Sequence, residues 1–391
     1  MIKYKVADVE TTTHNKGHRF DPRNILVSQH IKAPETLCDF YYHTDPDFYT
    51  PNKLDDCDVV VGFNFKFDFH WLYHLEPCLQ SKKIWDCQLA EFVYSGQKDS
   101  LISLDECLER YGLEKKKNMV AELWAAGVQT TDIDPALLEE YGNWDSSQTE
   151  QLFLIQWGLL SEAQKTLVFL LGEDLKTLVE MERHGLLFNQ KQAEGKANEY
   201  QIRIREIERL LQEQLPPIQS GVFNWDSGDH LSCFLYGGVV NFDYAVSEPA
   251  VYKSGDKKGQ PYVKNKWFVE TVPFPRLFVP IDKTELAKTK NKLDVPFRLY
   301  STDSPTLASL KVRTKQQKEI LTLLNERSKL KKVVEMIYSL FDQFETKQWE
   351  NNIIHGQYNQ NIAATGRLTS SAPNMQNTPP ELDEFFVSRF V

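Results

Sequence analysis

The hydrophobic positions of the first part of the chain alternate between two periods. Runs with period two predict strands, and runs with period 3.6 predict helices. The expected strands lie at 2–9, 24–31 and 56–65, and the expected helices at 67–75, 99–113 and 134–160. Asn64 and the pair Asp134-Pro135 are the starting signals for two of these helices. Strands and helices mixed in this way indicate an α/β layer fold.

From about residue 165 the apolar positions recur with the period of a helix. Helices are expected at 165–188, 189–215 and 314–344, the first ending at Gly185 and the second stopped by Pro216. Residues 240–300 hold several prolines and glycines and are predicted to be irregular. Two long helices around a basic, proline-rich tip predict an arm. We therefore expect two domains, at 1–160 and 161–391.

Charge is unevenly distributed. The 391 residues carry a net charge of −10, yet lysines crowd residues 251–292 and basic side chains recur at 311–332. The net negative charge argues against nucleic-acid binding, but the basic segments of the second half weaken that argument.

Composition also predicts a compartment. No apolar run approaches the roughly 20 residues that a membrane span needs, and the N-terminus lacks a signal-peptide core. The six cysteines form no C-x-x-C pair, so we expect free thiols in a reducing compartment. These features predict a cytoplasmic protein with no membrane contact.

The first candidate catalytic residues lie around the end of the first predicted strand, in the stretch VADVETTT at residues 6–13. Because side chains alternate across a strand, Asp8 and Glu10 project on one face, about 7 Å apart along the backbone. Two like charges this close repel unless a cation lies between them, and oxygen ligands suit Mg²⁺ or Mn²⁺.

A D-x-E pair is a weak signal in a chain with 55 acids, but companions follow in order. Asn64-x-x-x-Asp68 comes directly after a predicted strand, and Tyr141-x-x-x-Asp145 lies on a predicted helix, where i, i+4 spacing points both side chains the same way.

Together, Asp8, Glu10, Asp68, Tyr141 and Asp145 resemble the tyrosine-containing subclass of DEDD 3′→5′ exonucleases, over about residues 1–160. Residues 84–96 also resemble a helix of that family, with Asp86 in its aspartate position. The resemblance implies a ribonuclease-H-like fold and two Mg²⁺ (or Mn²⁺) ions. Asp8 would bridge both ions, Glu10 and Asp145 would hold the first, and Asp68 would support the second. Tyr141 would orient the attacking water and Asn64 would contact the substrate.

The second half carries a longer motif, HGQYNQNIAATGRLTSSAPNMQNTP at residues 355–379. It resembles the start of the palm in family A DNA polymerases of the phage type, and shorter stretches at 178–189, 223–231, 300–310 and 325–332 resemble their thumb. Asn189 and Ala363 depart from the family pattern. The resemblance implies contacts to primer-template DNA from Lys329, Lys331, Thr365, Arg367, Asn374, Gln376 and Asn377.

The sequence lacks the later palm and fingers motifs of that family, which carry its polymerase metal ligands. We therefore expect a proofreading 3′→5′ exonuclease with a thumb and partial palm, releasing 5′-dNMP by a two-metal mechanism. Polymerisation would require a second polypeptide with the remaining palm and fingers. Two alternatives stay open: a stand-alone exonuclease that trims RNA or DNA, and a non-catalytic DNA-binding assembly module.

Overall fold

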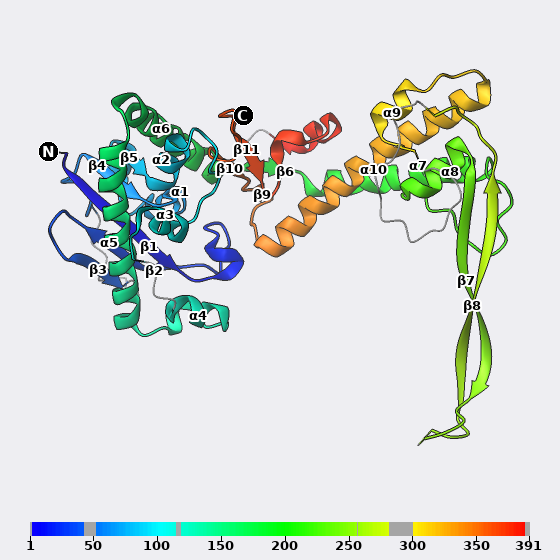
Figure 1. Cartoon of the computed structure of the whole chain (residues 1–391), viewed down its shortest axis with the longest axis horizontal. Coiled ribbons are helices and arrows are strands. Elements are labelled where there is room, and N and C mark those ends of the chain that lie inside the picture. The colour runs from blue at the N-terminus through cyan, green and yellow to red at the C-terminus, as the bar shows by residue number, and fades with distance from the viewer. Residues whose placement is uncertain (1, 43–51, 115–118, 256, 281–299, 388–391) are drawn as a thin grey trace. The chain divides into compact units, whose positions relative to one another are not determined.

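The computed structural model describes residues 2–42, 52–114, 119–255, 257–280 and 300–387 (Figure 1). The chain forms two compact units, and each is described by itself. Unit 1 combines residues 1–193 with 336–391, and unit 2 spans 194–335. The expected division at residue 160 does not coincide with these units. The reason is that the helix after residue 160 and the C-terminal segment both pack within unit 1.

Unit 1 is built on a five-stranded mixed sheet with the order β3-β2-β1-β4-β5. Its strands are β1 (Tyr4–Thr11), β2 (Leu26–Lys32), β3 (Cys38–Tyr42), β4 (Val59–Gly62) and β5 (Lys83–Asp86). Strands β1, β4 and β5 run parallel to one another, whereas β2 is antiparallel to both β1 and β3. The three predicted strands are present as β1, β2 and β4, with boundaries shifted by a few residues.

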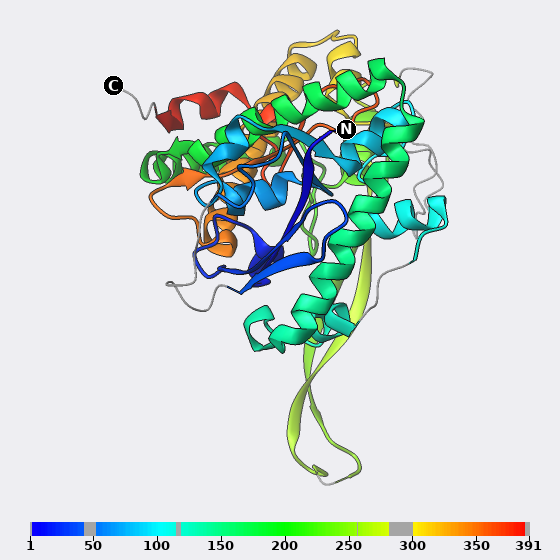
Figure 2. The same cartoon turned by 90° about the vertical axis from the view of Figure 1, so that its left-hand side faces the viewer.

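Helices cover this sheet, and the longest, α5, lies against β1 and β2 (Figure 2). The helices of unit 1 are α1 (Lys66–Leu72), α2 (Cys87–Tyr94), α3 (Leu104–Tyr111), α4 (Met119–Ala125), α5 (Pro135–Leu159) and α6 (Glu162–His184). As predicted, Asp134 caps α5 by accepting a hydrogen bond from the backbone N–H of Ala136 at 2.8 Å. Helix α6 ends before Gly185, also as predicted.

The side chain of Asn64 does not cap α1. Phe65 occupies the cap position, and no side chain hydrogen-bonds there. Asn64 instead takes a left-handed backbone conformation, with φ of 54°. Asparagine tolerates this region better than most residues, so the turn between β4 and α1 uses its backbone rather than its oxygen.

The core of unit 1 lies on both faces of the sheet. Val6, Val61 and Trp85 are fully buried on one face with Phe153 of α5. The opposite face is buried against α1 and α6, so α6 belongs to the core of this unit.

The C-terminal segment joins unit 1 through short strands. The order β12 (Phe386–Val387), β6 (Leu186–Phe188), β9 (Ile353–Ile354) forms one small sheet. β10 (Gln357–Asn359) and β11 (Thr369–Ser371) form a hairpin. Strand β12 pairs antiparallel with β6.

Unit 2 contains most of α7 (Gln190–Gln212) and α10 (Lys315–Lys347), together with α8 (Gly228–Tyr236) and α9 (Ser304–Ser309). Ion pairs fasten α10 within the unit: Arg203 of α7 meets Glu326 at 2.7 Å, and Arg327 meets Glu208 at 2.7 Å. The predicted long helices are therefore present.

The prediction of an irregular stretch at 240–300 is wrong over much of its length. β7 (Gly238–Val251) and β8 (Pro261–Phe274) form a long antiparallel hairpin, visible in Figure 1 beside α8. The hairpin is a two-stranded sheet, so each strand has one unpaired edge where Pro249 and Pro261 lose no ladder hydrogen bond. The lysines at 283–292 lie outside the described residues.

Candidate metal centre

Three carboxylates meet at the end of β1. Asp8 and Glu10 leave β1 on one face, and Asp145 comes from α5, which lies against that face. One oxygen of each side chain lies within 4.8 Å of the others. Glu10 and Asp145 are buried, and Asp8 is half-buried. Within the described part of the chain, these residues form the one acidic cluster with metal-ligand spacing.

Asp68 stands beside this trio rather than in it. Its Oδ1 accepts a hydrogen bond from the backbone N–H of Val9 at 3.1 Å, which ties the first turn of α1 to β1. Burial, followed by the negative charge of Asp8, raises the pKa of Asp68 well above its ordinary value. Crowded, desolvated carboxylates raise one another's pKa, and a cation would relieve this cost.

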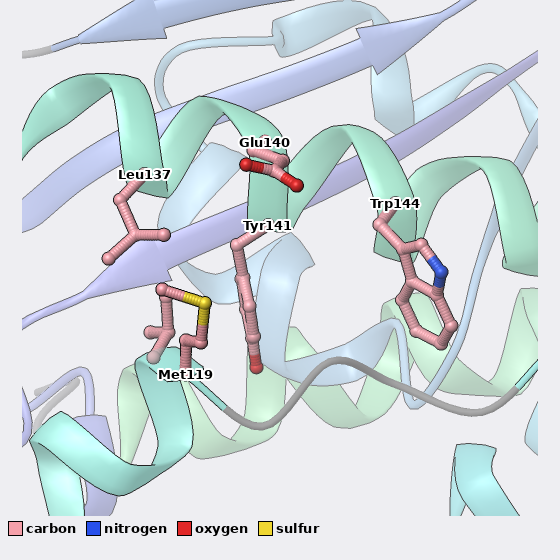
Figure 3. Close-up of a pocket in the computed structure, with 6 residues that line it drawn as sticks. Met119, Leu137, Glu140, Tyr141 and Trp144 are labelled. Atoms are coloured by element: carbon pink, nitrogen blue, oxygen red, sulfur yellow. The ribbon is translucent and has the colours of Figure 1, made fainter.

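Tyr141 lies one helical turn before Asp145. Figure 3 shows its ring projecting from α5 between Leu137 and Trp144, next to Met119 of α4. A cavity of about 20 Å³ borders the ring, which is enough for one water molecule. Burial, then the charges of Asp145, Glu10 and Asp8, raises the pKa of the Tyr141 hydroxyl. The hydroxyl therefore stays protonated near the carboxylates and can donate a hydrogen bond.

A glycine lets α5 approach the sheet closely enough to deliver Tyr141 and Asp145. A Cβ on Gly142 would lie 2.1 Å from Cε1 of His30 on β2. His30 is fully buried, pairs in register with Asp8, and lies 3.1 Å from Ser28 Oγ through Nε2. Burial lowers its pKa to about 4, so the ring under the helix is neutral. The sequence offered one signal for this contact, an isolated glycine inside a helical pattern.

Asp86 holds the start of α1 instead of joining the trio. Its carboxylate accepts hydrogen bonds from the backbone N–H groups of Asn64 at 3.0 Å, Phe65 at 2.8 Å and Gln88 at 2.8 Å. It thereby caps α2 and fixes the turn that leads to Asp68. Burial raises its pKa to about 6, although these donors act in the opposite direction.

A polar cavity of about 520 Å³ opens within unit 1, beside Asn64. It is lined by residues of the 15–20 loop, α1, the last residue of α10 and the 355–359 segment, among them the cations Lys16, Arg19, Lys66 and Lys347. The Gly17 turn of this loop packs on Thr11, the residue after Glu10. Sequence reasoning missed this basic cavity, because its cations come from segments far apart in the chain.

Glu182 organises the wall of the cavity. It meets Lys66 at 2.6 Å and His70 at 2.7 Å, and it accepts the backbone N–H of Tyr358 at 2.7 Å. Burial opposes its ionisation, but the bond from His70 and the charge of Lys66 lower its pKa overall. Asn361 reaches Gln88 of α2 at 2.9 Å, so the 355–361 stretch is fastened to the helices around the carboxylates.

The residues expected to contact duplex DNA fall into two groups, one in each unit. In unit 1, those flanking β11 are all exposed: Thr365, Arg367, Asn374, Gln376 and Asn377. The Asn374 side chain accepts the N–H of Gln376 at 3.1 Å, which orders this turn. In unit 2, Lys329 is exposed, whereas Lys331 pairs with Asp226 at 2.5 Å.

No helix in the described ranges is both long enough and apolar enough to span a membrane.

Comparison with known proteins relates one segment of the chain to a family. Residues 277–389 match the model of DNA polymerase family A. No curated protein sequence matches the chain. Among solved structures, the chain resembles the POL domain of Pol1 from M. smegmatis in complex with DNA primer-template and dNTP, with 16% identity and a TM-score of 0.63. The match covers 99% of this chain and 55% of that chain, so this chain spans about half of the solved structure. The likeness shows a shared mixed α/β fold.

Proposed function

This chain carries a segment of a family A DNA polymerase, and from that premise we propose that unit 1 is a 3′→5′ exonuclease acting on DNA. Its proposed role is to remove nucleotides from a 3′ end, while the exposed polar residues around β11 bind primer-template DNA. The requirement of a second polypeptide for polymerisation remains a prediction.

The proposal rests on one observation: carboxylate oxygens of Asp8, Glu10 and Asp145 lie within 4.8 Å of one another. Like charges at this spacing fit a divalent cation, because a cation offsets both their desolvation and their repulsion. Asp8, Glu10 and Asp145 would hold Mg²⁺ or Mn²⁺, and Asp68 would support a second ion. Bound ions of this kind lower the pKa of water and stabilise a leaving oxygen.

The protein groups around the trio would position the substrate. The Tyr141 hydroxyl stays protonated at neutral pH because burial and nearby carboxylates raise its pKa. It can therefore donate a hydrogen bond to the attacking water and orient it. Asn64, at the mouth of the basic cavity, would contact the terminal nucleotide, and Lys66 and Arg19 would attract the phosphates of the strand.

The test is release of nucleotides from a labelled single-stranded DNA oligonucleotide in Mg²⁺, with the protein carrying both Asp8→Ala and Glu10→Ala. We expect the rate to fall about a thousandfold or more, since the variant loses its cation ligands. Glu139→Gln, an exposed acid on α5, is the matched control and should leave the rate unchanged. Undiminished release by the double variant would refute the proposal. A faster reaction on an RNA oligonucleotide would favour the RNA-trimming alternative.

A further inference from the structure

The distal part of the β7–β8 hairpin stands apart from any core. Near its base, Val240, Phe242, Val272 and Phe274 are buried in the core of unit 2. From Asp243 and Val269 outward the side chains of the described residues are exposed or half-buried. About eight further residues per strand, at ~3.3 Å each, extend the hairpin by roughly 27 Å. An isolated two-stranded hairpin is marginally stable in water, so an exposed one this long favours a bound partner. We call residues 243–269 the ribbon.

The ribbon is basic within an acidic protein. The ribbon contains five lysines and three acids, whereas the whole chain has a net charge of −10. The lysines are exposed: Lys253, Lys257, Lys258, Lys264 and Lys266. None of them forms an ion pair with an acid among the described residues, and Lys266 lies 5.1 Å from the ring of Phe268. Unpaired positive charge on an exposed arm attracts a polyanion.

The two faces of the ribbon differ. The register places Trp267 opposite Ala245 and Val263 opposite Pro249, so one face is exposed and mostly apolar. The hydrogen-bonded polar pair Ser247 and Asn265 lies between these two pairs. The other face carries Lys266 and Lys264, the latter opposite Glu248, together with stacked rings, Tyr244 on Phe268 at 5.6 Å. Cations beside an apolar strip suit a ligand that presents both phosphates and the apolar edges of its sugars and bases.

We propose that the ribbon is a second DNA-binding element that lies in a groove of double-stranded DNA. A two-stranded β-ribbon fits the major groove, which is about 12 Å wide. Lysines bind phosphates without reading sequence, so the contact depends on salt and not on base order. This inference extends the proposed function. It rests on that function for one point only, that the ligand is DNA.

The experiment measures binding of a short fluorescent duplex by anisotropy over a series of salt concentrations, with chelator present so that no hydrolysis occurs. The variant replaces Lys257, Lys258 and Lys264 by Gln. The matched control replaces the exposed lysines Lys3, Lys98 and Lys191 of unit 1 by Gln. Unchanged melting of both variants shows that the exposed substitutions leave the fold intact.

We expect the ribbon variant to bind the duplex at least about tenfold more weakly at ~0.1 M salt. The slope of log K against log salt should become shallower by about 2 to 3, close to 0.9 for each lost phosphate contact. The control variant should match the unsubstituted protein. Equal affinity and slope for the two variants would overturn the proposal. An equal or larger loss on single-stranded DNA, or a loss confined to anionic lipid vesicles, would overturn it as well.

Nucleotide release from a very short single strand separates this proposal from the exonuclease proposal. The ribbon variant should keep the full rate on that substrate, since the ribbon binds duplex. If the unsubstituted protein releases no nucleotide but the ribbon variant still loses duplex affinity, the exonuclease proposal fails and the ribbon proposal stands.

Discussion

The carboxylate trio of unit 1 and the ribbon of unit 2 both gather like charges, but in opposite surroundings. Glu10 of β1 and Asp145 of α5 are buried, and burial, followed by their charges, raises the pKa of Tyr141. The ribbon lysines are exposed on a hairpin with no core around it, so water and salt screen their repulsion. Buried like charges therefore indicate a small counterion held by the protein, whereas exposed like charges indicate a large polyanion.

The buried carboxylate trio forms only because α5 packs closely on β1 and β2. Substitution of Gly142, which allows this close packing, is expected to have the largest effect. Gly142→Ala would place a methyl group 2.1 Å from the buried ring of His30. Either α5 or β2 must then shift, so we expect a loss of about 3–5 kcal/mol in the free energy of unfolding and loss of divalent-cation binding. Chemical denaturation and Mn²⁺ titration measure the two effects.

The control lies on the same helix. A Cβ on Gly158 meets no atom within 4 Å, so Gly158→Ala should be neutral or stabilise α5 by up to about 1 kcal/mol. If both alanine variants behave alike, close packing of α5 on His30 does not position Asp145.

A smaller effect is expected at Asp86, where burial raises the pKa from 3.8 to about 6. Because the folded pKa exceeds the unfolded pKa, protonation of Asp86 contributes stability below pH ~4 that is lost as the pH rises through about 6. The loss is on the order of 3 kcal/mol. Asp86→Asn removes this titration and keeps an oxygen acceptor, so the stability of wild type relative to the variant should fall between pH 4 and pH 7. Urea unfolding of both proteins at the two pH values measures this, and a pH-independent difference would contradict it.

The smallest effect is expected on the ribbon, at Trp267, whose side chain is 68% exposed. Trp267→Ser should change the free energy of unfolding by less than about 0.5 kcal/mol, because little buried surface is lost. The same variant should weaken duplex binding in the anisotropy assay. A large drop in stability would show that the ribbon packs against the protein, and the contrast between the two regions would then be lost.

Local sequence patterns predicted the strands and helices whose start, end or periodicity is determined by neighbouring residues. The alternation in β1, the Asp134-Pro135 start of α5 and the Gly185 end of α6 all have their cause in neighbouring residues. The i, i+4 spacing of Tyr141 and Asp145 likewise predicted that both lie on one face of α5.

The remaining features depend on contacts between distant segments. The β7–β8 hairpin was hidden by its prolines, which an isolated pair of strands accepts at its open edges. Asp86 clamps the backbone of residues 64–65, and no spacing rule links these positions. The expected boundary at residue 160 differs from the division into units because the buried Leu175 and Val179 of α6 pack in the first core, and local periodicity does not reveal which core a helix face joins.

The central claim is that Asp8, Glu10 and Asp145 hold divalent cations. Calorimetric titration with Mn²⁺ tests it directly, comparing the unsubstituted protein with Asp8→Asn and with the exposed control Glu139→Gln. The account predicts two bound ions for the protein and the control, and loss of the tighter ion in Asp8→Asn. Equal Mn²⁺ binding by all three proteins would contradict it.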